Sequence, residues 1–140
     1  MDNPILAPAA VLVAWTLVML LWTAVTRFSA LARVDLKGQD SRGARGSDLD
    51  NILPREVQWK SHNYNHLMEQ PTIFYAVVLI LALAGASALD VWFAWAYVVL
   101  RVIHSFWQSL VNTIPVRLTL FVLSSAMLIV LSVRALMLTL

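Results

Sequence analysis

Four long stretches of this 140-residue chain are almost free of charged side chains, and they limit what it can fold into. They span residues 3–26, 70–89, 91–112 and 118–133, and only the third is interrupted by basic side chains, those of Arg101 and His104. A helix needs about 20 consecutive apolar residues to cross the hydrocarbon core of a membrane. Stretches of this length and composition predict four transmembrane helices.

The composition agrees with a chain that lipid surrounds. Hydrophobic residues make up 60% of the chain and charged residues 13%, against about 25% charged residues in soluble domains. Inside lipid the backbone must satisfy its own polar groups, which favours helices. We predict one all-α domain over residues 1–140, a transmembrane four-helix bundle with helices at about 5–30, 55–85, 90–112 and 116–138. The second helix is expected to begin at Pro54, with Asn51 or Asp50 as its cap.

A polar segment separates the first two predicted helices. Residues 33–50 read RVDLKGQDSRGARGSDLD, and seven of the ten Lys and Arg residues lie between Arg27 and Lys60. Gly-rich polar sequence is typical of a loop, so we predict a flexible loop over about 34–53. Basic loops stay on the cytoplasmic side of a membrane. The loop therefore faces the cytoplasm, and both termini face away from it, across the inner membrane if the source is bacterial.

Two features of the ends and the composition exclude other classes. The chain begins Met1-Asp2-Asn3, without the basic region of a signal peptide, so we expect the first apolar stretch to be retained as a span. The chain contains no Cys, which excludes disulfides, thiolate metal ligands and a nucleophilic thiol of its own. Membrane lipids are expected partners, and nucleic acid is not.

Polar side chains form a stripe on each of the two middle helices. At about 100° per residue, the polar residues of the third helix fall within one arc of about 100°, and they are Arg101, His104, Ser105, Gln108 and Asn112. The second helix has a similar arc formed by His62, Asn65, His66 and Glu69. Charged groups are costly in hydrocarbon. We therefore expect the two stripes to face each other, with Glu69 as a counter-ion for Arg101 or Arg117.

The residues alone leave several interpretations of these stripes open. Buried polar groups can hold transmembrane helices together, line a small-molecule pocket, or form a proton or ion path. His62 and His66, four residues apart, suit two metal ligands, with Glu69 or His104 as a third, but no HExxH motif supports a metal site and we assign none. Arg134, near the far end of the fourth helix, is interpreted as a side chain that snorkels to the interface.

The order of the polar residues resembles a known family. Residues 63–75 read NYNHLMEQPTIFY and residues 101–117 read RVIHSFWQSLVNTIPVR. Together with four spans and a basic first loop, they resemble small prokaryotic-type members of the MAPEG family, the membrane-associated proteins in eicosanoid and glutathione metabolism. The resemblance covers nearly the whole chain. It implies a homotrimer whose active site lies between protomers, opens to the cytoplasm, and holds glutathione beside a lipophilic small-molecule substrate.

The resemblance also implies roles for particular residues. Arg117 matches the arginine that activates the glutathione thiol, and the residues matching or neighbouring the glutathione contacts are Glu69, Arg101, His104, His66, Asn112 and Arg27. Three positions differ from the usual pattern: His62 stands where an Arg is expected, His66 for an Asn and Gln108 for a Tyr. The expected activity is a glutathione-dependent transferase or peroxidase acting on lipophilic electrophiles. The alternative is a non-catalytic membrane protein whose stripes are structural or bind an anionic lipid.

Overall fold

The computed structural model describes residues 3–35, 42–43 and 45–140, and this part of the chain is helical without strands. Its long helices are α1 (Leu6–Leu31), α2 (Arg55–Ala84), α3 (Ala88–Leu110) and α4 (Ile114–Thr139). All four are long and apolar enough to cross a membrane. The predicted all-α fold with four membrane-length helices is confirmed.

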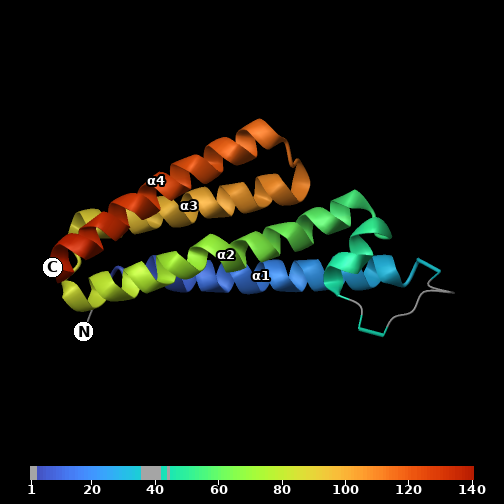
Figure 1. The fold of residues 1–140 in the computed structure, drawn as a ribbon, viewed down its shortest axis with the longest axis horizontal. Coiled ribbons are helices and arrows are strands. Elements are labelled where there is room, and N and C mark those ends of the chain that lie inside the picture. Colours follow the sequence, from blue (N-terminus) through green and yellow to red (C-terminus); the bar gives the residue numbers. More distant parts are fainter. Residues whose placement is uncertain (1–2, 36–41, 44) are drawn as a thin grey trace.

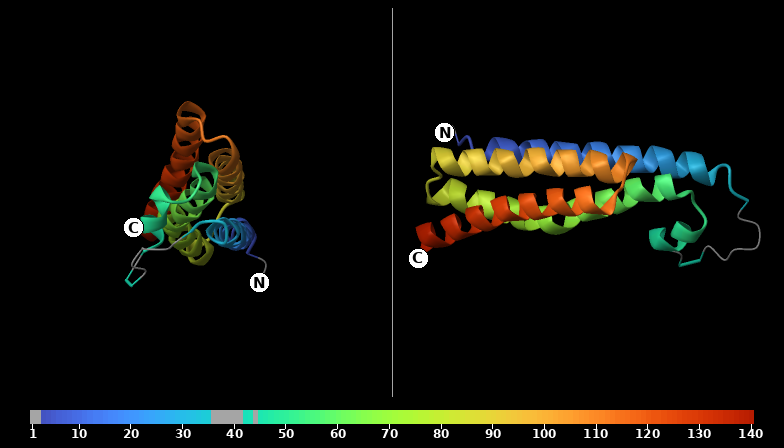
Figure 2. Two further views of the ribbon diagram at one scale, coloured as in Figure 1. Left: turned by 90° about the vertical axis from the view of Figure 1, so that its right-hand side faces the viewer. Right: turned by 90° about the horizontal axis from the view of Figure 1, so that it is seen from above.

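The helices form two antiparallel pairs, α1 with α2 and α3 with α4 (Figure 1). The start of α1 and the end of α4 lie at one end of the bundle, and the loop that follows α1 lies at the other (Figures 1 and 2). Toward its N-terminal end α4 diverges from α2 (Figure 1). The bundle is therefore widest where the polar stripes of α2 and α3 were predicted to meet.

The outer faces of the helices carry many large apolar side chains. Leu83 is 90% exposed, and Phe28 and Trp92 are more than 70% exposed. An exposed apolar surface of this extent on membrane-length helices is solvated by lipid. The core between the helices is small and includes Leu12, Met19, Leu67, Phe74, Leu81 and Tyr97.

The turn between α2 and α3 has clear local causes. Gly85, at φ +100°, ends α2 in the left-handed conformation that glycine adopts without strain. Ser87 then caps α3: its Oγ accepts from the Asp90 backbone N–H at 3.3 Å, and the Asp90 carboxylate accepts from the Ser87 N–H at 2.8 Å. The buried Asp90 also accepts two hydrogen bonds from Arg134, at 3.0 and 3.2 Å. Arg134, which was interpreted as snorkelling to the interface, therefore has a carboxylate partner at that end of the bundle.

The loop between α1 and α2 is partly ordered. Within the predicted flexible segment lies a 3-10 helix, η1 (Gly46–Asn51), opened by the Arg45 N–H, which donates to Asp48 Oδ2 at 2.6 Å. Arg27 of α1 donates to the carbonyl of Gly46 at 2.5 Å. This tertiary contact fixes η1 against the bundle. Residues 36–41 and 44 of the predicted loop lie outside the described residues.

Neither residue expected to cap α2 does so. Pro54 precedes the first helical residue, and α2 has no side-chain cap. Asp50 instead pairs with Arg27 at 3.8 Å and with His62 Nε2 at 3.1 Å. Asp50 thus connects η1 to both α1 and α2.

Candidate functional site

The polar stripe of α3 faces the interior. Arg101 and Ser105 are fully buried, His104 is 2% exposed and Gln108 is 7% exposed. The helical spacing predicted that these side chains face the neighbouring helix rather than lipid, and the burial of all four confirms this orientation. These side chains need polar partners, because an unpaired polar group away from water is costly.

The facing side of α2 differs from the predicted stripe. Asn63 Nδ2 donates to Ser105 Oγ at 2.5 Å, His66 accepts from Arg101 at 3.0 Å, and Gln70 accepts from the Tyr97 hydroxyl at 3.3 Å. We call this row of polar contacts between α2 and α3 the polar seam. Asn63, His66 and Gln70 follow the helical spacing i, i+3, i+7, and this spacing was the sequence signal for the polar seam. The predicted member Asn65 is exposed instead. The two helices therefore meet through polar pairs, but on a face of α2 shifted from the prediction.

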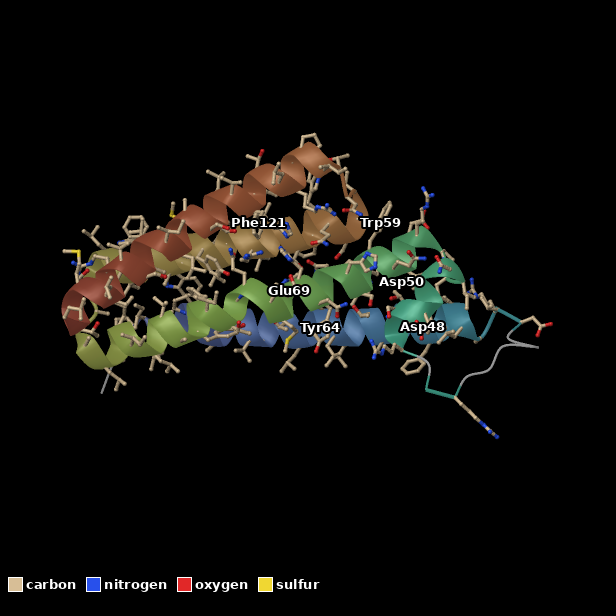
Figure 3. All side chains as sticks on the ribbon, in the orientation of Figure 1. Asp48, Asp50, Trp59, Tyr64, Glu69 and Phe121 are labelled. Carbon is tan, nitrogen blue, oxygen red and sulfur yellow. The ribbon has the colours of Figure 1, made fainter. Side chains whose placement is uncertain are left out.

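A cavity of about 350 Å³ opens beside this seam. Its walls come from His62, His66 and Glu69 of α2, His104 and Gln108 of α3, and Ile114, Arg117, Leu118 and Phe121 of α4. Figure 3 shows Glu69 and Phe121 on the two diverging helices. One wall is polar and the other is mainly apolar, so the cavity suits an amphipathic ligand.

Arg117 is held at the cavity by the turn before α4. Asn112 adopts φ +56°, a left-handed conformation that Asn tolerates better than most residues. Its side-chain oxygen accepts from Arg117 Nη1 at 2.8 Å. Thr113 accepts from Trp107 Nε1 at 2.9 Å, which ties the same turn to α3. The turn thus fixes a guanidinium in the first turn of α4, where the backbone N–H groups add positive potential.

Arg101 does not line the cavity, in contrast to Arg117. It is fully buried behind His66, His104 and Phe121, which do line it. Its guanidinium lies 5.3 Å from the ring centroids of both Tyr97 and Phe121. Among the predicted site residues, Glu69, His66, His104 and Arg117 are brought to one cavity, and Asn112 positions Arg117.

The expected ion pair of Glu69 is also different. In the described part of the chain, Glu69 Oε2 lies 3.4 Å from His66 Nδ1, and neither Arg101 nor Arg117 comes within salt-bridge distance of it. Its side chain is 71% exposed. Glu69 is therefore an accessible carboxylate at the edge of the cavity, available to a cationic group of a ligand.

Unsatisfied polar atoms indicate where a ligand would bind. Gln108 Oε1 is buried at the cavity wall without a hydrogen-bond partner. The His66 and His104 rings lie 5.0 Å apart, and no hydrogen bond joins them. An amide acceptor, three imidazoles, one guanidinium and one carboxylate thus converge on a cavity of a size suited to a small peptide or metabolite.

Arg27 lies in a different place from the other predicted residues. It lines a polar pocket of about 310 Å³ with η1 and Asn65, and it donates to Ser61 Oγ at 2.7 Å. Another cavity, of about 260 Å³, lies between α1 and α2 and is lined mostly by apolar side chains with Tyr64 and Tyr75. Arg27 therefore has a role in holding η1, and its contact with glutathione stays a prediction.

The apolar wall from α4 was not predicted from the sequence. Ile114, Leu118 and Phe121 share a face with Arg117 at spacings of three and four residues, and this was the available signal. Among the described residues, no group of three or more His, Asp or Glu side chains is placed to hold a metal ion.

Comparison with known proteins gives one finding about relationship. The sequence model of the MAPEG family matches residues 5–137, which includes α1 to α3, all of α4 except its last two residues, and the whole cavity. A search of curated proteins and a search of solved structures each found no match.

Proposed function

Because the chain belongs to the MAPEG family, we propose that it is a glutathione-dependent membrane enzyme that acts as a transferase or peroxidase on lipophilic electrophiles. The observation that carries the proposal is the fixed guanidinium of Arg117 at a cavity with one polar and one apolar wall. The family connects this chain to glutathione chemistry, and the cavity provides groups that suit it.

The donors and acceptors of the cavity fit the charges of glutathione, which carries two carboxylates, one ammonium group and a thiol. Glu69 is placed to accept the ammonium group, because its carboxylate is exposed at the cavity edge. The unpaired Gln108 Oε1 can accept an amide N–H. His66 and His104 can donate to a carboxylate, so each kind of group in the tripeptide has a counterpart.

Arg117 is the catalytic residue in this proposal. A free thiol has a pKa of about 8.5, so only a small fraction is thiolate at neutral pH. A guanidinium stays charged and attracts the thiolate, which raises that fraction. Bound glutathione would supply a thiolate that forms a C–S bond with an electrophilic carbon as that carbon's bond to a leaving group, such as chloride, breaks. Alternatively, two glutathione molecules would reduce a hydroperoxide to alcohol and water while forming a disulfide.

The apolar wall gives the second substrate a route. Ile114 and Leu118 are 66% and 57% exposed, on the side of α4 that lipid or a neighbouring protomer covers. A lipophilic substrate can therefore reach the cavity from the bilayer without crossing water. We place the cavity on the cytoplasmic side, where glutathione is available, and within a homotrimer whose neighbouring protomers complete it.

Calorimetry with detergent-solubilised protein tests the proposal. Wild type should bind glutathione and conjugate an activated aryl chloride. Arg117→Lys should keep the Kd for glutathione within a few-fold of wild type but lower turnover at least tenfold. The reason is that the compact ammonium group of Lys replaces a planar guanidinium whose donors have fixed directions. Arg55→Lys, the same change at an exposed position away from the cavity, is the matched control and should behave as wild type.

One result would support the competing class. If wild type takes up no glutathione at any concentration tested, the polar seam is structural or binds a lipid head group. The proposed enzyme function would then be abandoned.

A further inference from the structure

Arg101 is a buried cation without a carboxylate partner. It is fully buried, and in the described part of the chain no Asp or Glu oxygen lies within 4.0 Å of it. Its Nε donates to the Tyr97 hydroxyl at 3.2 Å, and Nη2 has no partner. The rings of Tyr97 and Phe121 cover its guanidinium. Such a group does not reach a ligand in the cavity unless the side chains in front of it move.

The contact between Arg101 and His66 has only one chemical interpretation. A guanidinium carries donors and no acceptor, so in the 3.0 Å contact Arg101 Nη1 donates and His66 Nε2 accepts. A ring nitrogen that accepts carries no hydrogen, so the His66 ring is neutral and its hydrogen is on Nδ1. That Nδ1–H faces Glu69 Oε2 at 3.4 Å.

The bond from His66 to Glu69 is easily replaced. At 3.4 Å it is long for an N–H···O hydrogen bond, and the Glu69 side chain is 71% exposed. A ligand anion in the cavity can take the Nδ1–H while the Glu69 carboxylate turns to a ligand ammonium. The His66 N–H and the Glu69 carboxylate then both bind the ligand, and the neutral imidazole places no extra positive charge beside Arg101.

We propose that Arg101 is a positioning residue that acts through His66: it holds the imidazole in the Nδ1–H tautomer, so that His66 presents a fixed N–H donor to an anionic group of the ligand. This assignment rests on the proposed function for the identity of that ligand, glutathione. It replaces the expectation that Arg101 itself contacts glutathione. His104 packs against His66 from another side, with the ring centroids 5.0 Å apart and the ring planes tilted by 34°.

The tautomer is measured directly by NMR of isotope-labelled histidine, which distinguishes the two neutral tautomers from the imidazolium. The chain has three His residues, and the signal lost in His66→Asn identifies His66. Wild type should show Nδ1–H. Arg101→Met should mix the tautomers or charge the ring, whereas Arg101→Lys should keep Nδ1–H, because an ammonium group also only donates.

Glutathione affinity provides the second measurement. Arg101→Met should weaken binding about tenfold, the effect of losing one oriented hydrogen bond to a charged group. In the His66→Asn background the same substitution should have little further effect on glutathione affinity, because the imidazole through which Arg101 acts is absent. Arg101→Lys should restore affinity to within about threefold of wild type, which separates positioning from a failure to fold.

Two results would overturn the assignment. One is a wild-type His66 that is charged or carries its hydrogen on Nε2. The other is a loss of affinity from Arg101→Met that is equally large in the wild-type and His66→Asn backgrounds. If this loss also disappears when a glutathione carboxylate is converted to an amide, Arg101 contacts that carboxylate directly. If wild type binds no glutathione, the proposed function fails, while the tautomer measurement still decides the role of Arg101.

Discussion

Asn112 combines a backbone role and a side-chain role at one position. Its φ of +56° lies in the left-handed region, and its amide oxygen accepts from Arg117 Nη1 at 2.8 Å. Few residues meet both demands, because left-handed backbone costs about 1 kcal/mol for most side chains. Glycine adopts the conformation without strain but has no side-chain amide. The two roles can therefore be separated by substitution.

We expect Asn112→Gly to lower turnover about tenfold while the free energy of unfolding changes little. The backbone turn survives, but Arg117 loses the group that orients it, and misplacement of a catalytic cation is costly for rate. Steady-state kinetics and denaturant unfolding in micelles measure the two effects. Asn112→Ala should show the same loss of turnover with an added destabilisation of about 1 kcal/mol. Unchanged turnover in the glycine variant would mean that Asn112 does not position Arg117.

At the scale of elements, the start of α3 depends on a few polar contacts. The capping box of Ser87 and Asp90 satisfies N–H groups at the start of the helix, and Asp90 also binds Arg134 of α4. Ser87→Ala should lower the free energy of unfolding by about 1 kcal/mol, and Ser87→Thr should keep most of it. Asp90→Ala should destabilise the protein more, because it removes the cap and the ion pair together. Thermal unfolding in detergent measures this order, and equal effects of the two alanine variants would show that Arg134 adds nothing.

The sequence was sufficient for the long helices because their causes are local. Charge-free length predicted α1 to α4, and helical spacing predicted that Arg101, His104 and Gln108 face inward. Contacts between residues far apart in the chain leave no such pattern. Asp90 and Arg134 are 44 positions apart, and η1 depends on Arg27, 19 positions before Gly46.

The candidate site was predicted less completely than the fold for the same reason. The residue types were identified, but which of the two arginines, Arg101 or Arg117, reaches the cavity depends on depth and on neighbouring rings. Arg101 has Tyr97 and Phe121 around its guanidinium, whereas Arg117 follows a turn and faces open space. Spacing along one helix gives a direction around its axis, and it gives no information on what a second helix places in front.

At the scale of the whole molecule, the diverging helices and the polar loop belong to the same half of the bundle. The cavity lies near the start of α4, and η1 lies beyond it, at the end of the bundle away from both termini (Figure 1). The basic residues of the loop predict that this end faces the cytoplasm. The orientation of the chain therefore decides whether the cavity receives cytosolic glutathione.

Single cysteines test this orientation cleanly, because the chain has none of its own. Ser47 of η1 and Leu140 at the end of α4 are both exposed and lie at opposite ends of the bundle. A membrane-impermeant maleimide added outside intact bacterial cells whose outer membrane is permeable to it should label Leu140→Cys and not Ser47→Cys. After the inner membrane is opened both should react, and the cysteine-free wild type should never react. The reverse labelling would place the loop outside, remove the cavity from the glutathione pool, and require a different ligand for Arg117.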